Sequence, residues 1–348
     1  MVTNQTQTTT KWSFNEELPN GKTLFFVDAT LLKDLAHCEQ YFAYRHVLNK
    51  RAKFSTKAKP FPMAIGSWWS TAMEKFYGAL MEHKAITTDD IMTFSLQAWA
   101  ENDLDDCMVA DPDKFIQFGD LAGSVLMLQD YYNSQYLIDQ QNWEIVGVET
   151  GFGLNREVFI GESDSVVVFW IGRPDLVVLE GGQRLIPIDH KTVTRIDGDT
   201  ITRYKPSAQM PGYIYATQII AKQLGITQVK DIDRCIINIC SRSRPTDKPR
   251  SGPKRPRFIR AYPTWNRDEI EEWKQGVIHK CERIAHCLKY NDWVWSETGC
   301  DNLYMRKCDY KKVDSVVPAA RDIIFEADFV TGEPWKPYQI TKVKDKED

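Results

Sequence analysis

The sequence has no long apolar run, no closely spaced cysteine pair and no strong net charge. None of its apolar stretches approaches the roughly 18 residues that a membrane-spanning helix needs, and its N-terminus is polar, unlike a signal segment. Its eight cysteines show no CxxC spacing and no compact disulfide framework, and no internal repeat is visible. These absences exclude a membrane protein and a small secreted domain, so we expect a cytoplasmic protein without a membrane partner.

The composition predicts one large domain between two tails. Hydrophobic residues make up 43% of the 348 residues, which is enough for a sizeable core. The polar and charged ends indicate disordered tails on either side of a single domain, at 1–22, 23–335 and 336–348. Within the domain we expect a helical front, an α/β core and a cysteine-containing C-terminal segment, at 23–140, 143–290 and 291–330.

The spacing of apolar residues predicts the elements of this domain. Helical periodicity and capping residues indicate helices at 29–48, 65–83, 120–140, 207–224 and 266–290. Runs of β-branched and aromatic residues indicate strands at 144–154, 165–179, 184–192, 233–241 and 258–264. The order of helices, three strands, a helix, two strands and a helix is typical of an α/β fold with a mixed central β-sheet flanked by helices.

The stretch GRPDLVVLEGGQRLIPIDHKT, residues 172–192, is predicted to form a hairpin with acidic ends. Asp189 and Lys191 lie two residues apart in a strand, so their side chains share one face. A three-residue loop at 181–183 would place Asp175 directly opposite Asp189, with the Cβ atoms about 5 Å apart. A two-residue loop would put the two acids on opposite faces, so the length of the loop decides the geometry.

Two carboxylates held this close repel each other unless a cation lies between them. Hard oxygen ligands suit Mg²⁺ or Mn²⁺. A lysine on the same face can orient water and stabilise negative charge on a phosphorus centre. These groups together suit hydrolysis of a phosphodiester. The alternative is that Asp175 only follows Pro174 at a bend, while Asp189 and Lys191 form a solvent-exposed pair.

A basic segment follows the predicted sheet strand that ends near residue 241. The sequence SRSRPTDKPRSGPKRPRFIR, residues 241–260, contains eight lysines or arginines and one acid in a protein whose formal net charge is −4. A solvated loop is the ordinary explanation for such a run, but near a phosphodiester site it favours contacts to backbone phosphates. The nucleic-acid-binding candidates are Arg242, Arg244, Arg250, Lys254, Arg255 and Arg257.

Three motifs in order resemble those of the PD-(D/E)XK nuclease superfamily. These are GRPD, then IDHK, then the Gln-x-x-x-Tyr of QMPGY, which is similar to the RecB-like branch of phage exonucleases and CRISPR adaptation nucleases. The resemblance implies Asp175 and Asp189 as metal ligands with the His190 carbonyl, and Lys191 as the catalytic lysine. It implies Gln209 and Tyr213 as DNA contacts near the scissile phosphate, within a restriction-endonuclease-like core.

The resemblance extends toward the N-terminus, where the chain departs from the pattern. AIGSWWSTAMEKFY, residues 64–77, resembles the helix in which many members carry a metal-binding histidine four residues after a glycine. This chain has Ser70 at that place. The acids that remain as candidates to complete the metal shell are Glu74, one turn later, and Glu149, at the first strand.

Three of the cysteines match part of the ligand pattern of an iron-sulfur cluster. Several RecB-like members hold a [4Fe-4S] cluster with one early and three late cysteines, and Cys38, Cys300 and Cys308 match three of these places. The fourth falls near Asp314, so the set is incomplete, which argues against a stable cluster unless Asp314 or another ligand serves. For Cys235, Cys240, Cys281 and Cys287 we expect ordinary packing in the core.

The leading hypothesis is a metal-dependent deoxyribonuclease, exonucleolytic and phage-like, that acts in DNA recombination, replication or processing. Its expected partner is DNA, with a helicase or recombination protein as a further candidate, in a bacterial or phage-infected host cell. Two alternatives stay open. One is a non-catalytic DNA-binding or assembly protein that keeps the nuclease fold, and the other is a structure-specific or restriction-like endonuclease.

Overall fold

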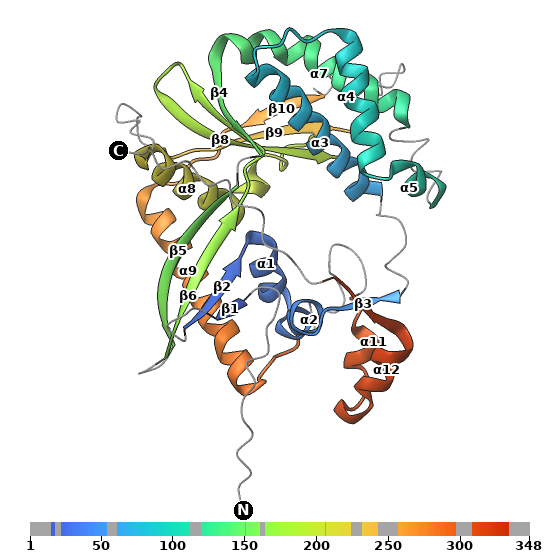
Figure 1. Cartoon of the computed structure of the whole chain (residues 1–348), viewed down its shortest axis with the longest axis vertical. Helices are drawn as coiled ribbons and strands as arrows, with labels where there is room; N and C mark the ends of the chain where they lie inside the picture. Colours follow the sequence, from blue (N-terminus) through green and yellow to red (C-terminus); the bar gives the residue numbers. More distant parts are fainter. Residues whose placement is uncertain are drawn as a thin grey trace, which may run out of the picture. The chain divides into compact units, whose positions relative to one another are not determined.

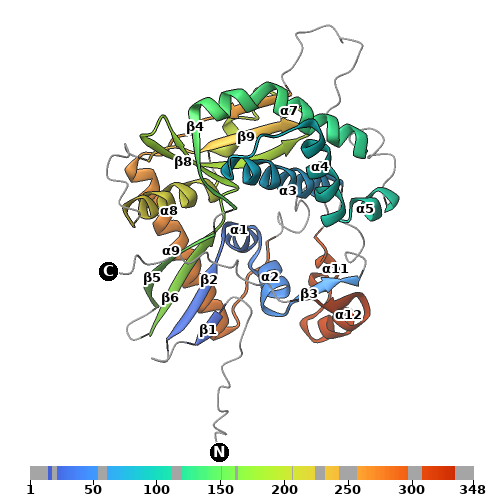
Figure 2. The ribbon, with the colours of Figure 1, turned by 45° about the horizontal axis from the view of Figure 1, so that its top comes forward.

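The computed structural model describes residues 15–17, 22–53, 61–110, 120–149, 151–160, 164–205, 207–223, 232–242, 257–296 and 308–333. The chain forms two compact units (Figures 1 and 2). Unit 1 comprises Met1–Thr56, Gly153–Ile171 and Lys274–Gln339, and unit 2 comprises Lys57–Phe152, Gly172–Trp273 and Ile340–Asp348. That the two units act as a single domain stays a prediction.

A mixed sheet of five strands forms the centre of unit 2. Its strands are β4 (Trp143–Val148), β7 (Leu176–Glu180), β8 (Arg184–Val193), β9 (Ile236–Ser241) and β10 (Phe258–Ala261). Their order is β10-β9-β8-β7-β4, and only the pair β8–β9 is parallel. A parallel pair needs a crossover, which α8 (Gln209–Gln223) supplies. The central strand β8 is buried along most of its length, as expected for a strand covered on both faces. The mixed sheet with its flanking helices confirms the predicted α/β class.

Helices cover both faces of this sheet, as Figures 1 and 2 show: α3 and α7 lie on one side and α8 on the other. The helices of unit 2 are α3 (Phe61–Met81), α4 (Thr88–Glu101), α5 (Leu104–Ala110), α7 (Leu121–Asn142), α8, the short η3 (Thr202–Tyr204) and the start of α9 (Arg267–Tyr290). Helix α3 buries Trp68, Trp69 and Tyr77 in the core between the helices and the sheet. In the described part of the chain, no helix is long and apolar enough to cross a bilayer.

Unit 1 contains a second sheet and most of α9. The sheet has the order β1-β2-β6-β5, formed by β1 (Asn15–Glu17), β2 (Thr23–Val27), β6 (Asp164–Gly172) and β5 (Phe152–Ile160). Early and late segments of the chain pair through β3 (Lys50–Ala52) and β11 (Phe329–Thr331). The helices are α1 (Ala29–His37), α2 (Glu39–Phe42), the π-helix η1 (Ala43–Val47), α11 (Lys311–Asp314), η4 (Pro318–Ala320) and α12 (Arg321–Asp328).

Several predicted elements are divided in the structure. The helix expected at 29–48 is broken because Cys38 has extended backbone angles and caps the next helix. The strand at 144–154 is two strands, β4 and β5, because Glu149 has a positive φ of 48° and turns the chain. The strand at 165–179 is also two, β6 and β7, since Pro174 interrupts the ladder.

Other elements were not predicted at all. Helices α4 and α5 lie in a segment that the sequence left unassigned, and β1 lies inside the tail expected to be disordered. Strand β1 acquires order by pairing with β2, a contact that local composition does not reveal. The tail expected at 336–348 lies outside the described residues.

Candidate active site on the β7–β8 hairpin

The hairpin has the predicted register. Glu180 pairs with Arg184 around a three-residue loop whose Gly181 and Gly182 have positive φ of 57° and 68°, a conformation that glycine adopts without strain. Continuing this register one step beyond Leu176–Ile188 places Asp175 opposite Asp189. The predicted three-residue loop is confirmed, and the shared face of the two acids stays a prediction because Asp175 precedes the first paired residue.

The two aspartates and Lys191 form a compact charged group. The His190 backbone N–H donates to Asp175 Oδ2 at 2.6 Å, and Lys191 Nζ lies 2.6 Å from Asp189 Oδ2. Burial and the negative charge of Asp189 raise the pKa of Asp175 well above its ordinary value. Burial lowers the pKa of Lys191, but the charges of Asp189 and Asp175 outweigh this effect and raise it. Lys191 is therefore a fixed cation beside a buried carboxylate.

Glu149 is the acid at the turn after β4, next to the hairpin. Its backbone N–H donates to the Asp175 carbonyl at 3.0 Å, so the turn after β4 is tied to the hairpin. Its carboxylate lies 2.6 Å from Arg173 Nε and accepts a 3.5 Å hydrogen bond from the Ser70 hydroxyl. Burial raises the pKa of Glu149 to about 7, against the opposing charge of Arg173. Ser70, at the place of the family histidine, thus contacts Glu149, whereas Glu74 is exposed.

The His190 side chain lies on the opposite face of β8 from its two neighbours. Its ring stacks on Tyr77 with centroids 5.6 Å apart, and its Nδ1 accepts from the Asn238 amide at 3.0 Å. Burial lowers the pKa of His190 to about 3, so the ring is neutral at physiological pH. Its side chain is a structural group, which leaves only the backbone carbonyl for the role that the resemblance implies.

Helix α8 brings Gln209 and Tyr213 to the GRPD segment. Gln209 Nε2 donates to the Tyr213 hydroxyl at 2.5 Å, and this hydroxyl donates to the Arg173 carbonyl at 3.0 Å. The Tyr213 ring is buried edge-to-face against Phe152, so its hydroxyl, rather than an open ring face, is directed at the hairpin. Gly172 leaves room for both rings, because a Cβ there would lie 2.6 Å from Phe152.

Only two of the six basic candidates lie in the described residues. Arg257 forms an ion pair with Asp130 of α7. Arg242 is buried at the end of β9 and donates to the Thr194 hydroxyl at 2.9 Å. The remaining four, Arg244, Arg250, Lys254 and Arg255, lie outside the described residues.

The candidate iron ligands are likewise only partly described. Cys38 and Cys308 belong to one buried cluster in unit 1 with Tyr41, Tyr44 and Tyr310, and Asp314 accepts from the Tyr44 hydroxyl at 3.1 Å. Cys300 lies outside the described residues. The four other cysteines that we assigned to the core, Cys235, Cys240, Cys281 and Cys287, are buried as expected.

The donors on the hairpin fit a hard divalent cation. Asp175, Asp189 and Glu149 offer carboxylate oxygens only, the ligands that Mg²⁺ and Mn²⁺ prefer. Within the described ranges, however, no group of three or more histidine, cysteine, aspartate or glutamate side chains is drawn together closely enough to hold a metal ion. The carboxylate oxygens therefore suit Mg²⁺ or Mn²⁺, but the described side chains do not by themselves form a complete coordination shell.

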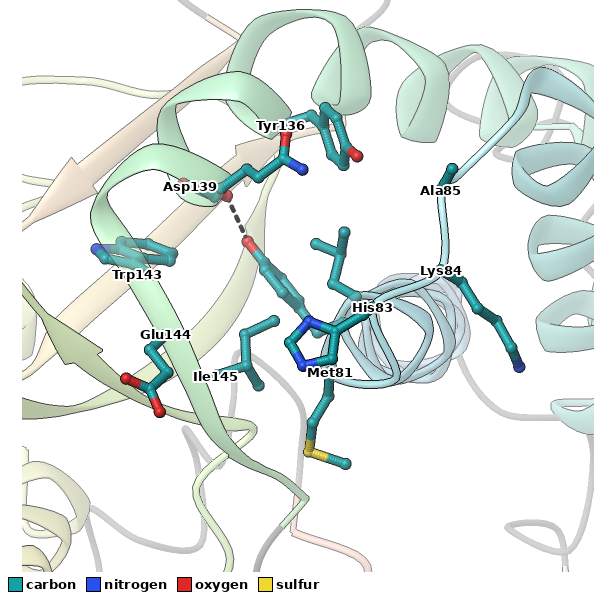
Figure 3. A pocket seen from close by; sticks show the side chains of 12 residues that line it. Met81, His83, Lys84, Ala85, Tyr136, Asp139, Trp143, Glu144 and Ile145 are labelled. Carbon is teal, nitrogen blue, oxygen red and sulfur yellow. Dashed lines mark hydrogen bonds between the residues drawn. The ribbon is translucent and has the colours of Figure 1, made fainter.

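A separate pocket of about 480 Å³ lies at the other end of β4 (Figure 3). It is lined by His83 and Lys84 after α3, by Asp139 of α7 and by Trp143 of β4, among others. The dashed line in Figure 3 marks the 2.7 Å hydrogen bond from the Tyr77 hydroxyl to Asp139. None of the predicted site residues lines this pocket.

Comparison with known proteins agrees with the motifs. Residues 29–313 match the family model of the PD-(D/E)XK nuclease superfamily, which spans most of the chain. The chain belongs to this superfamily, and is a nuclease in that general sense. A search of curated proteins finds no match. Among solved structures, the crystal structure of SSO0001 is similar at 15% identity and a TM-score of 0.28, covering 72% of this chain and 94% of that one.

Proposed function

We propose that the protein is a metal-dependent deoxyribonuclease of the RecB-like branch that removes nucleotides from DNA ends during recombination, replication or processing. The observation that carries this proposal is the hairpin, where Lys191 Nζ lies 2.6 Å from Asp189 Oδ2 and Asp175 Oδ2 accepts from the His190 backbone N–H at 2.6 Å. A helicase or recombination protein is the proposed partner, and the cytoplasm of a bacterium or phage-infected cell the proposed location.

Asp175, Asp189 and the His190 carbonyl would hold Mg²⁺ or Mn²⁺, with Glu149 as the preferred further ligand and Glu74 as the weaker candidate. The bound cation would polarise the phosphate and lower the pKa of water. Lys191 orients the attacking water and balances the negative charge that grows on the phosphate oxygens. Gln209 acts through the Tyr213 hydroxyl to hold the GRPD backbone, and its amide is available to a phosphate oxygen.

Cleavage assays of Lys191→Ala test this function. We expect the wild-type protein to degrade linear DNA with Mg²⁺ or Mn²⁺, and Lys191→Ala to lose at least about a hundredfold in rate, the usual scale for one charged group that stabilises a transition state. Lys75→Ala is the matched control, because Lys75 on α3 forms an exposed ion pair with Glu101 at the end of α4. Undiminished cutting by Lys191→Ala would overturn the assignment.

The choice of DNA separates the remaining alternatives. Covalently closed circular DNA that resists the enzyme, while the same DNA after linearisation is degraded, supports exonuclease action. Cutting of the closed circle supports the endonuclease alternative. Binding of DNA without metal and without any cutting supports the third alternative, a non-catalytic DNA-binding protein. The observation that favours this alternative is Ser70, which stands at the place of the family histidine.

A further inference from the structure

Arg173, in the GRPD segment, is an exposed arginine beside the candidate active site. Its Nε lies 2.6 Å from Glu149 Oε2, and its side chain is 46% exposed, whereas that of Glu149 is 10% exposed. The Glu149 backbone N–H donates to the carbonyl of Asp175 at 3.0 Å, so this ion pair is tied to the hairpin. Arg173 is therefore the solvent-accessible partner of a largely buried carboxylate at the site.

The backbone of Arg173 is held in place, whereas its side chain is able to move. Its carbonyl accepts from the Tyr213 hydroxyl at 3.0 Å, and this hydroxyl accepts from the Gln209 amide at 2.5 Å. Pro174 restricts the backbone of the residue before it to extended conformations. Exposed side chains change rotamer within nanoseconds. The guanidinium can therefore exchange its partner without any rearrangement of the backbone.

A phosphate that approaches this site meets mainly negative charge. Asp175, Asp189 and Glu149 supply carboxylates here. Among the described residues, the cations that pair with these acids are Lys191, whose side chain is 33% exposed, and the more exposed Arg173. The planar, forked guanidinium of an arginine matches two oxygens of a phosphate. Since exposed ion pairs are weak, a phosphate held by the rest of a DNA strand competes with the carboxylate for Arg173.

We propose that Arg173 exchanges the Glu149 carboxylate for one backbone phosphate of a DNA strand that binds at the hairpin. The contact is made to the phosphate and not to a base, so it strengthens the binding of any DNA sequence. The exchange also releases Glu149, the acid proposed above as the further metal ligand, from its ion pair. This inference rests on the proposed function for the identity of the ligand, DNA, but it does not require that the DNA is cut.

A double-mutant cycle in EDTA tests the exchange in the absence of metal and of cutting. The affinity for a fluorescent DNA duplex is measured by anisotropy at about 0.1 M salt, which screens charges that are not in contact. Arg173→Met should weaken binding at least about threefold, because the charge-assisted hydrogen bond to the phosphate outweighs the ion pair that is broken. Glu149→Gln should tighten binding at least about threefold, because the guanidinium no longer leaves a carboxylate. In the Arg173→Met background, Glu149→Gln should change the affinity by less than about twofold.

Additivity is the result that contradicts the proposal. If Glu149 only repelled DNA and Arg173 only attracted it, Glu149→Gln would tighten binding equally in both backgrounds. Unchanged binding by Arg173→Met would overturn the proposal as well. The double variant should bind at least about tenfold more weakly than Glu149→Gln, a comparison without the unpaired carboxylate that destabilises Arg173→Met. In the same comparison the slope of log Kd against log salt concentration should decrease by about 0.9, the value for one phosphate, and an unchanged slope would contradict a phosphate contact.

The matched control is the ion pair between Lys75 of α3 and Glu101 of α4, which has a 2.7 Å contact. Lys75→Met, Glu101→Gln and their combination should bind DNA within about twofold of the wild type, since this pair joins two helices and not the hairpin. The same coupling in this pair would be a general effect of removing an ion pair, and would contradict the role of Arg173. An additive cycle in a protein that cuts DNA rejects this inference and leaves the nuclease function standing. The expected cycle in a protein that cuts no DNA does the reverse.

Discussion

Single residues on β8 alternate between the side of the candidate site and a buried polar network. Asp189 and Lys191 face one side, while His190 between them bonds to Asn238 on the other. Asn238 also donates to the Tyr131 hydroxyl at 2.7 Å, and Tyr131 lies 2.7 Å from the Tyr77 hydroxyl. Among the described residues His190 Nε2 has no hydrogen-bond partner, so the network holds the ring through Nδ1 alone. We interpret the network as a support that keeps the two catalytic candidates in place.

The buried neutral state of His190 has a measurable consequence. Since burial lowers its pKa to about 3, the unfolded chain binds one more proton than the folded chain between that value and about pH 6.5. This contribution to stability is present above pH 6.5 and decreases as the pH falls, by at most about 1.4 kcal/mol per pH unit. Urea unfolding in EDTA at pH 7 and pH 5.5 should show a smaller pH effect in His190→Gln, which keeps an acceptor for Asn238. The same pH effect in both proteins would rule out this role.

Glu149 is the residue that we expect to matter most for metal affinity. It is bonded to the backbone of Asp175, and its carboxylate is held beside the site by Arg173, while Glu74 is exposed. Glu149→Gln should raise the Mn²⁺ concentration for half-maximal cutting at least about tenfold, and Glu74→Gln should change it much less. Metal titrations of both variants make the comparison. A larger effect of Glu74→Gln would indicate that Glu74 on α3, rather than Glu149, is the further metal ligand.

At the scale of elements, the glycine of GRPD leaves the space that the Phe152 and Tyr213 rings occupy within unit 2. A Cβ at Gly172 would lie 2.6 Å from Phe152 and 3.1 Å from Tyr213, so both rings must move in Gly172→Ala. We expect a loss of about 1–3 kcal/mol in unfolding free energy and slower cutting, because Tyr213 holds the Arg173 carbonyl. Gly78→Ala in α3, where no atom lies within 4 Å, should instead gain about 0.5–1 kcal/mol. Chemical denaturation of both proteins, together with their cutting rates, tests the pair.

The sequence was most informative where the pattern is local. The turn glycines and the two-residue spacing of Asp189 and Lys191 predicted the hairpin correctly, and Asn266 with Glu269 forms the predicted capping box of α9. The N-terminus of α4 was missed although it is also local, because its capping box uses Asp90 with Thr87 instead of a glutamate. A search for this variant of the motif would have found it.

What the sequence could not reveal depends on distant partners. Strands β4 and β5 were read as one because both are apolar, yet they belong to different sheets. Glu149 was suggested only by resemblance, and its contacts with Ser70 and Arg173 arise from three separate parts of the chain. The burial of Arg242 could not be predicted either, since an arginine in a basic run is ordinarily solvated. Whether such side chains are buried or solvated depends on distant parts of the folded chain, which the local sequence does not specify.

At the scale of the whole molecule, the early and late parts of unit 1 depend on each other. Cys38 and Tyr44 pack in the same apolar cluster as Tyr310 and Phe325, more than 260 residues later, and β3 pairs with β11. A match to the family model that begins at residue 29 and ends at residue 313 spans both parts. The C-terminal segment is therefore a component of the fold, whether or not its cysteines bind iron.

Phe329 and Val330 on β11 test this dependence side by side. Phe329 is 5% exposed and stacks on Tyr310 with centroids 5.2 Å apart, whereas Val330 is 38% exposed on the other side of the strand. Phe329→Ala should destabilise unit 1 by about 3–5 kcal/mol, and Val330→Ala by no more than about 0.5 kcal/mol. Hydrogen exchange should then accelerate at the β3 amides in Phe329→Ala but not at those of β8, since the two strands belong to different units. Unchanged exchange at β3 would mean that the late segment adds nothing to the early one.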